Sequence, residues 1–146
     1  MMQQSCLLSL AVADREAKSI FANVHDFGWE LLYPRDIYGV QEKRQLPTSF
    51  AMGDLVKVVF SIRFESNEPS GYEDIIERMW VVVDRSTAFG YIGRLDNNPD
   101  SMVENDELWS GVEVPFCVDH VVDFAPGDTD TLEVLAEPAR LVWPRP

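Results

Sequence analysis

Alternation of apolar and polar residues is clearest in the middle of the chain. In "GDLVKVVFSIRFE", every second residue from Val56 to Phe64 is apolar, a period that predicts a half-buried strand with one apolar face. Shorter runs predict further strands: "WELLY" before it, and "ERMWVVVD", "GYIGRL" and "GVEVPFCV" after it. Because consecutive short strands pair with their neighbours, the pattern predicts a strongly bent antiparallel sheet or a small barrel.

A helical pattern is predicted near the N-terminus. Asp14 is a residue that starts helices, because its carboxylate accepts hydrogen bonds from the free amides of the first turn. Apolar residues then recur at helical spacing, as a stripe that can pack on a sheet: Ala17, Ile20, Phe21 and Val24. The run "SCLLSLAVA" before Asp14 predicts a short buried strand. We therefore expect an α+β fold with one main N-terminal helix packed on the bent sheet.

Glycine and proline refine the strand predictions. Gly90 and Gly93 predict a bend, a bulge or a close backbone approach in their strand. Pro115 cannot donate to a ladder, so its strand is expected to lie at an edge or to end there, with Glu113 and Pro115 pointing outward. We expect a polar loop in "SNEPSGYED", a short turn in "DHVVDF" and room for one more strand around Leu132 to Leu135.

The length of 146 residues fits a single domain, 1–146. The patterns divide it into a strand–helix–strand part (1–50), an antiparallel β core (51–124) and a C-terminal extension (125–146).

The predicted compartment is the cytoplasm. The apolar stretch at the start has no basic region before it, which a secretory signal needs. No apolar run reaches the roughly 20 residues of a membrane-spanning helix, so no membrane partner is expected. In a reducing compartment the two cysteines, Cys6 and Cys117, are expected to be free thiols.

Several of these strands together resemble bacterial domain of unknown function family 2314. The resemblance covers about residues 50–124 and rests on a Gly-Asp strand, a Met-Trp-Val strand, a Gly-x-Leu-x-Asn-x-Pro return and a closing strand followed by a His or Ile and an Asp. The matching residues are Gly53, Asp54, Met79, Trp80, Gly93, Leu95, Asn97, Pro99 and Asp123. The family has no established activity, so the resemblance implies a fold and a bacterial source, and by analogy a role like that of immunity proteins beside toxins.

Charge narrows the class of partner. The formal net charge is -13, from 25 acidic and 12 basic residues, and such a field repels the phosphates of nucleic acids. Acidic segments recur in "ESNEPSGYED", "DNNPDSMVENDE" and "DFAPGDTDTLE". They either serve solubility or match a basic partner protein.

A calcium-loop pattern lies in "DNNPDSMVENDE". Oxygen-bearing side chains fall at several positions of a twelve-residue calcium loop: Asp96, Asn98, Asp100, Glu104 and Glu107. The sixth position is Ser101 where the loop needs glycine, and the flanks are predicted as strands where the motif needs helices. We therefore interpret the segment as a solvated turn and expect neither a bound metal nor another cofactor.

The chain's two cysteines and two histidines are the remaining metal candidates. Cys117 and His120 are three residues apart, and with Cys6 and His25 they would make a four-ligand zinc set. A second close pair is missing, so a buried thiol and a turn histidine are the preferred interpretation.

No sequence motif for catalysis is present. The chain has neither a Gly-x-Ser-x-Gly elbow nor a glycine-rich phosphate loop. A Cys117–His120 dyad lacks a third orienting group, and 25 acidic residues make chance carboxylate pairs common.

Trp80 permits two interpretations: packing in a strand covered on both sides, or contact with a partner. The candidate binding residues are Trp80, Arg94, Asn97, Asp100 and His120. We expect a non-enzymatic protein-binding module, such as an immunity-type inhibitor of a basic toxin. The alternative is a small-molecule-binding domain or enzyme with a pocket near Trp80, Asn97 and His120.

Overall fold

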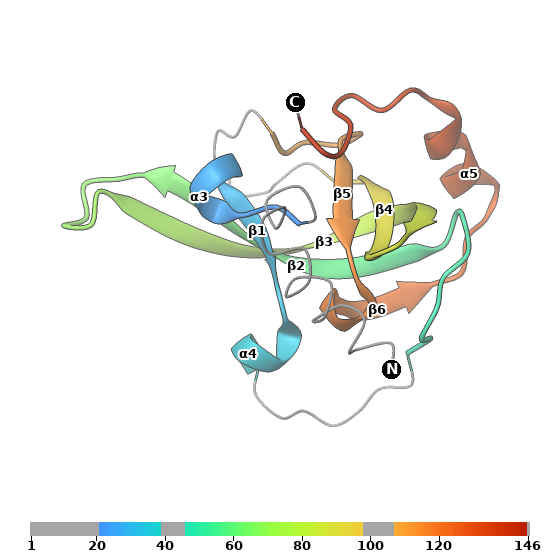
Figure 1. Ribbon diagram of the computed structural model, residues 1–146, viewed down its shortest axis with the longest axis horizontal. Coiled ribbons are helices and arrows are strands. Elements are labelled where there is room, and N and C mark those ends of the chain that lie inside the picture. Colours follow the sequence, from blue (N-terminus) through green and yellow to red (C-terminus); the bar gives the residue numbers. More distant parts are fainter. Residues whose placement is uncertain (1–20, 39–45, 98–106, 146) are drawn as a thin grey trace.

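One curled antiparallel sheet forms the centre of the molecule (Figure 1). The computed structural model of the chain describes residues 21–38, 46–97 and 107–145. Its strands are β1 (Trp29–Leu32), β2 (Leu55–Glu65), β3 (Tyr72–Thr87), β4 (Gly90–Leu95), β5 (Glu113–Phe116) and β6 (Val121–Ala125). The bent antiparallel sheet predicted from the sequence is confirmed.

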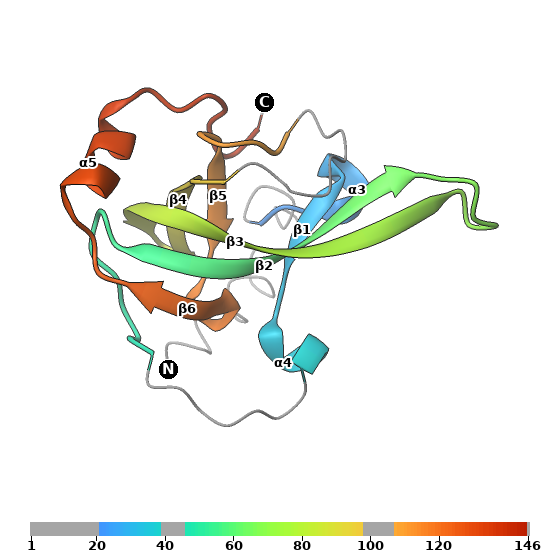
Figure 2. The same ribbon diagram turned by 180° about the vertical axis from the view of Figure 1, so that it is seen from behind.

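The sheet curls because two strands share one edge of β2. The path runs β1-β2-β3-β4-β5, and β6 also pairs with β2. β1 pairs with residues 59–62 of β2, and β6 with residues 55–58. A short 3₁₀ helix, η2 (Val118–His120), leads from β5 back to β6, so the chain curls into a half-barrel (Figure 2).

The segment "DHVVDF", expected as a turn, instead contains β6. Its residues Val121 to Ala125 pair with the start of β2. Alternation over so few residues is a weak local signal, and the pairing depends on a strand more than 60 positions earlier.

Three helices lie in the described residues: α3 (Val24–Phe27), α4 (Pro34–Tyr38) and α5 (Thr129–Ala136). The strand predicted in "SCLLSLAVA" and most of the predicted N-terminal helix lie outside those residues. The strand expected around Leu132 is wrong, because α5 occupies that segment. Asp128 caps α5: its Oδ1 accepts from the Thr131 amide at 3.0 Å, and its own amide donates to Thr131 Oγ1 at 2.9 Å.

The main core lies on one face of the sheet. It takes the predicted apolar face of β2 and residues from β1, β3, β5 and the C-terminal segment, including Trp29, Val56, Val58, Phe60, Ile62, Met79, Val81, Val114, Phe116 and Trp143. β3 is covered on both faces in its middle, since Val81, Val82 and Val83 are all buried. The interpretation of this strand as covered on both sides is confirmed.

Beyond the body, β2 and β3 continue as a two-stranded hairpin, which we call the arm (residues 63–78). It projects away from the other strands and helices (Figure 1). The loop at its tip is shorter than "SNEPSGYED", because β3 already begins at Tyr72 and pairs it with Glu65.

β4 crosses β3 closely at Gly93. A Cβ atom at this position would lie 2.5 Å from Val81 Cγ1 and 2.5 Å from the Val82 carbonyl oxygen. The register between β3 and β4 also shifts between Val83 and Arg85. The predicted close approach is confirmed, and with the bulge it bends the sheet. As expected from Pro115, β5 lies at the end of the strand order.

We predict that Gly93→Ala lowers the free energy of unfolding by about 2–3 kcal/mol, because the added methyl group overlaps buried neighbours. Urea denaturation measures the change. The control is Gly71→Ala, where a Cβ meets nothing within 4 Å and only the φ of +88° is strained, at a cost of about 1 kcal/mol. Equal losses in the two variants would contradict the close approach.

Candidate functional site

The structure brings two of the predicted site residues together and separates the others. Trp80 on β3 contacts Asn97 just after β4. Arg94 and His120 are buried, in different polar settings. Asp100 lies outside the described residues.

Trp80 and Asn97 meet through the backbone. The Trp80 amide donates to Asn97 Oδ1 at 2.7 Å, and the Trp80 carbonyl accepts from the Asp96 amide at 2.9 Å. The indole of Trp80 is half-buried, and Lys57 Nζ lies over it at 5.0 Å from the ring centroid, as a cation–π contact. Trp80 therefore lies outside the main core, on the face opposite its neighbours Met79 and Val81.

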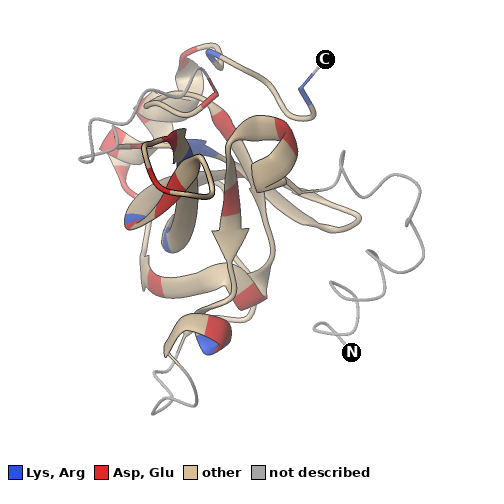
Figure 3. Ribbon diagram, turned by 90° about the vertical axis from the view of Figure 1, so that its left-hand side faces the viewer, with Lys and Arg blue, Asp and Glu red and all other residues tan. Residues whose placement is uncertain are grey.

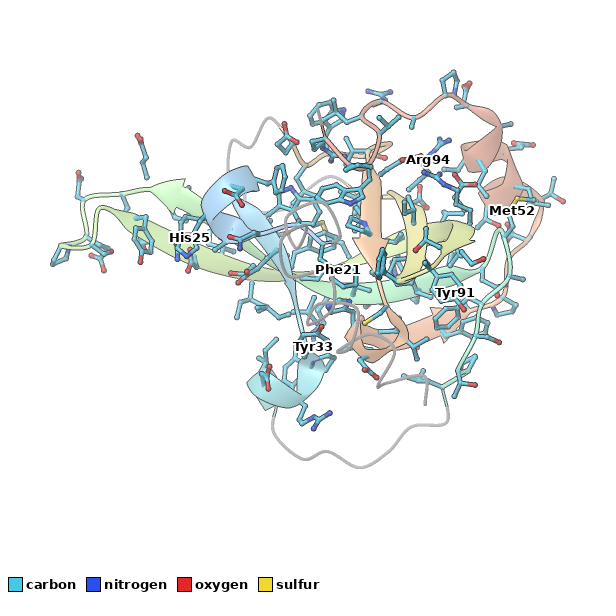
Figure 4. All side chains as sticks on the ribbon, viewed as in Figure 1. Phe21, His25, Tyr33, Met52, Tyr91 and Arg94 are labelled. Atoms are coloured by element: carbon cyan, nitrogen blue, oxygen red, sulfur yellow. The ribbon has the colours of Figure 1, made fainter. Side chains whose placement is uncertain are left out.

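Arg94 joins the sheet to α5, as Figure 4 shows. Only 7% of the residue is exposed. Its Nη1 donates to the carbonyl oxygen of Glu137 at 2.7 Å and, more weakly, to that of Val134 at 3.4 Å. These are carbonyls at the C-terminal end of α5, where a cation is favourable. Arg94 thus anchors a helix, and its contacts are internal.

Glu113 is a buried carboxylate that the sequence pattern placed outside. It is 4% exposed, because the C-terminal segment covers it: the Glu113 amide donates to Leu141 O at 2.8 Å. Glu113 Oε1 accepts from the Trp143 amide at 2.8 Å, and Arg85 donates to both carboxylate oxygens at 3.0 and 3.2 Å. The expected outward orientation of Pro115 is also wrong, since this residue is buried.

Burial of Glu113 by itself would raise its pKa. The hydrogen bonds from Arg85 and Trp143 and the charges of Arg85 and Arg94 outweigh burial and lower the pKa below its usual value. Glu113 therefore stays ionised and holds the C-terminal segment on the sheet.

We predict that Glu113→Gln lowers the free energy of unfolding by about 2 kcal/mol, because it removes the buried charge that pairs with Arg85 and Arg94. Glu133→Gln on the exposed face of α5 is the matched control, with an expected change within about 0.5 kcal/mol. Thermal or urea unfolding measures both. No difference between the variants would mean that the buried network adds nothing to stability.

His120 is a buried, neutral imidazole. Its ring stacks on Tyr33 with centroids 4.4 Å apart and meets the edge of Phe21 at 5.4 Å. Its Nδ1 accepts from the Cys117 amide at 3.0 Å. Burial lowers the pKa of His120 from 6.5 to about 3. The ring fixes the turn between β5 and β6, and it is only 3% exposed.

The lowered pKa predicts a loss of stability in acid. Below pH 6.5 the unfolded chain takes up a proton on His120 that the folded chain refuses down to about pH 3. The free energy of unfolding should therefore fall by roughly 1.4 kcal/mol per pH unit in this window from His120. His120→Asn keeps a side-chain acceptor and should lose this slope in urea titrations at several pH values, whereas His25→Asn, at an exposed position, should keep it. A slope unchanged in His120→Asn would contradict the assignment.

The metal candidates are affected by three observations. Cys117 is disulfide-bonded, so the expectation of a free thiol is wrong for Cys117. That expectation rested on the lack of a basic region before the N-terminal apolar stretch, which bears on the compartment and not on which sulfur atoms lie close together. Cys6 lies outside the described residues. Among the calcium-loop positions, Glu107 forms an ion pair with the buried side chain of Arg145, with 2.6 Å between Glu107 Oε1 and Arg145 Nε.

Within residues 21–38, 46–97 and 107–145, no group of three or more His, Cys, Asp or Glu is arranged to hold a metal. The other calcium-loop positions Asn98, Asp100 and Glu104 lie outside these ranges.

The arm carries an exposed, acidic surface that includes the acidic segment "ESNEPSGYED" noted in the sequence. Its acidic residues are Glu65, Glu68, Glu73, Asp74 and Glu77, against two basic residues, Arg63 and Arg78. Figure 3 looks from the arm toward the body. The side chains of Ile76 and Tyr72 are also exposed, at 51% and 39%.

Arg63 stiffens the arm across its two strands. It pairs with Asp74 through two hydrogen bonds of 2.8 and 3.0 Å, and its guanidinium lies 3.6 Å from the centroid of the Tyr72 ring. The hydrogen bond from Arg63 lowers the pKa of Asp74, which keeps this carboxylate ionised. Side-chain contacts therefore link the two strands of the arm in addition to the backbone ladder.

Comparison with known protein families, with curated proteins and with solved structures finds no match for this chain. Among the described residues, no helix is long and apolar enough to cross a membrane.

Proposed function

We propose that this chain is a non-enzymatic protein-binding module whose partner presents a basic surface. The observation that carries the proposal is the arm, a projecting hairpin with five acidic residues against two basic ones. A two-stranded hairpin by itself is only marginally stable in water. An arm that is internally cross-linked by Arg63 and exposes Ile76 is suited to contact another molecule.

Charge complementarity points to the kind of partner. The acidic excess on the arm adds to a net charge of -13 on the whole chain. Such a field accelerates encounter with a positively charged protein and repels nucleic acid. In its most specific form, the proposal is an immunity-type inhibitor that covers the basic active site of a toxin.

The resemblance to family 2314 remains part of this proposal. It is supported by the contact between two separate parts of the motif, because the Trp80 amide bonds to Asn97. The alternative pocket near Trp80, Asn97 and His120 has less support. The ring of His120 packs against Tyr33 and Phe21, and the indole of Trp80 already has Lys57 over it.

The proposal predicts that neutralising the arm slows association with a basic partner. The test partner is the purified protein encoded beside this gene, measured by surface plasmon resonance between 50 and 300 mM salt, values we choose to span strong and weak screening. Glu65→Gln, Glu68→Gln and Glu73→Gln in one variant should reduce the association rate about tenfold at low salt and flatten its salt dependence.

A matched variant controls for net charge. Asp36→Asn, Asp130→Asn and Glu133→Gln also remove three carboxylates, at exposed positions on α4 and α5. It should change the rate by less than about threefold if the arm makes the contact. Equal effects of the two variants, or a neighbouring protein that neither binds nor loses activity, would refute the proposal.

A further inference from the structure

One edge of β3 is open along the arm. β4 pairs with β3 only from Val81 onward, and β2 occupies the opposite edge from Tyr72 to Val82. Among the described residues, no strand pairs with the outer edge of β3 between Tyr72 and Met79. The edge is therefore a row of backbone groups with no partner strand in the described part of the chain.

The alternation of the ladder identifies which residues face this edge. Val83 exchanges hydrogen bonds with Gly53 and Asp54 on the β2 side, whereas Trp80 bonds to Asn97 and Asp96 on the other side. Because successive residues of a strand face opposite edges, odd-numbered residues of β3 face β2 here. Asp74, Ile76 and Arg78 direct their amides and carbonyls toward the open edge.

Side chains close both ends of this row. At the tip, Ser70 Oγ donates to the Tyr72 carbonyl at 2.9 Å and accepts from its amide at 3.4 Å. At the body, Asn97 Oδ1 accepts from the Trp80 amide at 2.7 Å. The open stretch is thus bounded, and its length suits a short added strand of about five residues.

The middle of the edge lacks the usual protection. Natural edge strands are guarded by charged side chains, prolines or bulges. Here Asp74 is held by Arg63 on β2, and the guanidinium of Arg78 lies 4.9 Å from the centroid of the Tyr38 ring. Between them Ile76 is an apolar residue with half of its surface in water.

The residues around the edge indicate what would pair with it. Glu73 and Glu77 alternate with the edge residues and lie on the opposite face of β3 from Ile76. A strand with basic residues at alternate positions would place them beside these carboxylates and its apolar residues beside Ile76. Such a strand matches the acidic arm in charge, whereas an acidic strand would be repelled.

We infer that the edge of β3 from Asp74 to Arg78 binds an extended segment of alternating basic and apolar residues from the partner, as an added strand. This inference rests on the proposed function and specifies the surface used. Backbone hydrogen bonds supply affinity in this mode of recognition, and alternate side chains supply specificity.

Amide hydrogen exchange by NMR tests the edge directly. In the free protein the amides of Asp74, Ile76 and Arg78 should exchange much faster than those of Ile75 and Glu77, which face β2. An eight-residue peptide of alternating lysine and valine should slow exchange at the three edge amides at least about tenfold at saturation. Unchanged exchange at these amides would overturn the inference.

A matched pair of peptides separates strand pairing from charge. A second peptide carries N-methyl groups on its valine amides, which face β3 when the valines lie opposite Ile76, so it keeps every lysine but cannot complete the ladder. It should bind at least about tenfold more weakly by calorimetry. Equal affinity would refute strand addition while leaving an electrostatic arm, and with it the proposed function, intact.

Variants at Ile76 test the same point on the protein. Ile76→Pro removes an edge amide that the β2 ladder does not use, so proline is tolerable there. It should weaken both the peptide and the neighbouring-gene protein at least about tenfold, whereas Ile76→Thr keeps the amide and should lose less. Circular dichroism establishes that Ile76→Pro is folded, and the N-methylated peptide provides the test if it is not.

A second copy of this chain is the competing occupant. Sedimentation that shows a concentration-dependent dimer, abolished by Ile76→Pro, would assign the edge to self-association and overturn the inference. Suppose that the partner binds Ile76→Pro with the affinity of the parent protein but binds the arm-charge variant (Glu65→Gln, Glu68→Gln and Glu73→Gln) more weakly. The inference then fails and the proposed function stands. If neither variant affects the partner, both fail.

Discussion

The ladder between β2 and β3 is the constraint on which the rest of the structure depends. It joins 11 residue pairs, from Leu55–Val82 at one end to Glu65–Tyr72 at the other. The free edge of β2 then accepts β1 and β6 end to end, and that of β3 accepts β4. Every other strand is placed by this pair, directly or through β4. The ladder between β2 and β3 also extends beyond the segments that pair with β1, β4 and β6. This extension is the arm with its open edge.

Two buried polar side chains, Glu113 and His120, position the C-terminal segment and the turn between β5 and β6. Glu113 gathers Arg85 and the amide of Trp143, so the C-terminal segment lies against β5. His120 accepts from the Cys117 amide in the turn that leads from β5 to β6. A buried polar group is costly unless it is hydrogen-bonded, so these contacts select one arrangement of turn and tail. Arg94, a candidate binding residue by sequence, belongs to this internal framework.

The candidate binding surface arises from the part of the ladder that the core does not use. The body buries the apolar face of β2, and the buried network occupies Glu113 and Arg94. The arm is left with charged residues, Ile76 and one edge with which no strand of the described residues pairs. Asn97 connects the two regions, because its side chain ends the open edge at Trp80. An Asn in a glycine-and-proline return thus has a structural role at the boundary of the proposed site.

The sequence by itself determined β2 from its strong local period, β4 from a short strand-like run, the edge position of Pro115 and the close approach at Gly93. These follow from side-chain alternation and from the lack of a Cβ or an amide, which act over a few residues. The Met-Trp-Val and Gly-x-Leu-x-Asn-x-Pro motifs also identified Trp80 and Asn97 as candidate site residues, and the two are in contact in the structure. The predicted N-terminal strand and most of the predicted helix lie outside the described residues.

Only the tertiary structure decided the rest. β6 is a strand because β2 offers it an edge, and Glu113 is buried because a segment some 30 residues later covers it. The open edge of β3 is likewise invisible in the sequence, since it depends on β4 being much shorter than β3. Backbone hydrogen bonds carry no side-chain identity, and so the pattern of residues cannot tell which of them remain without a partner.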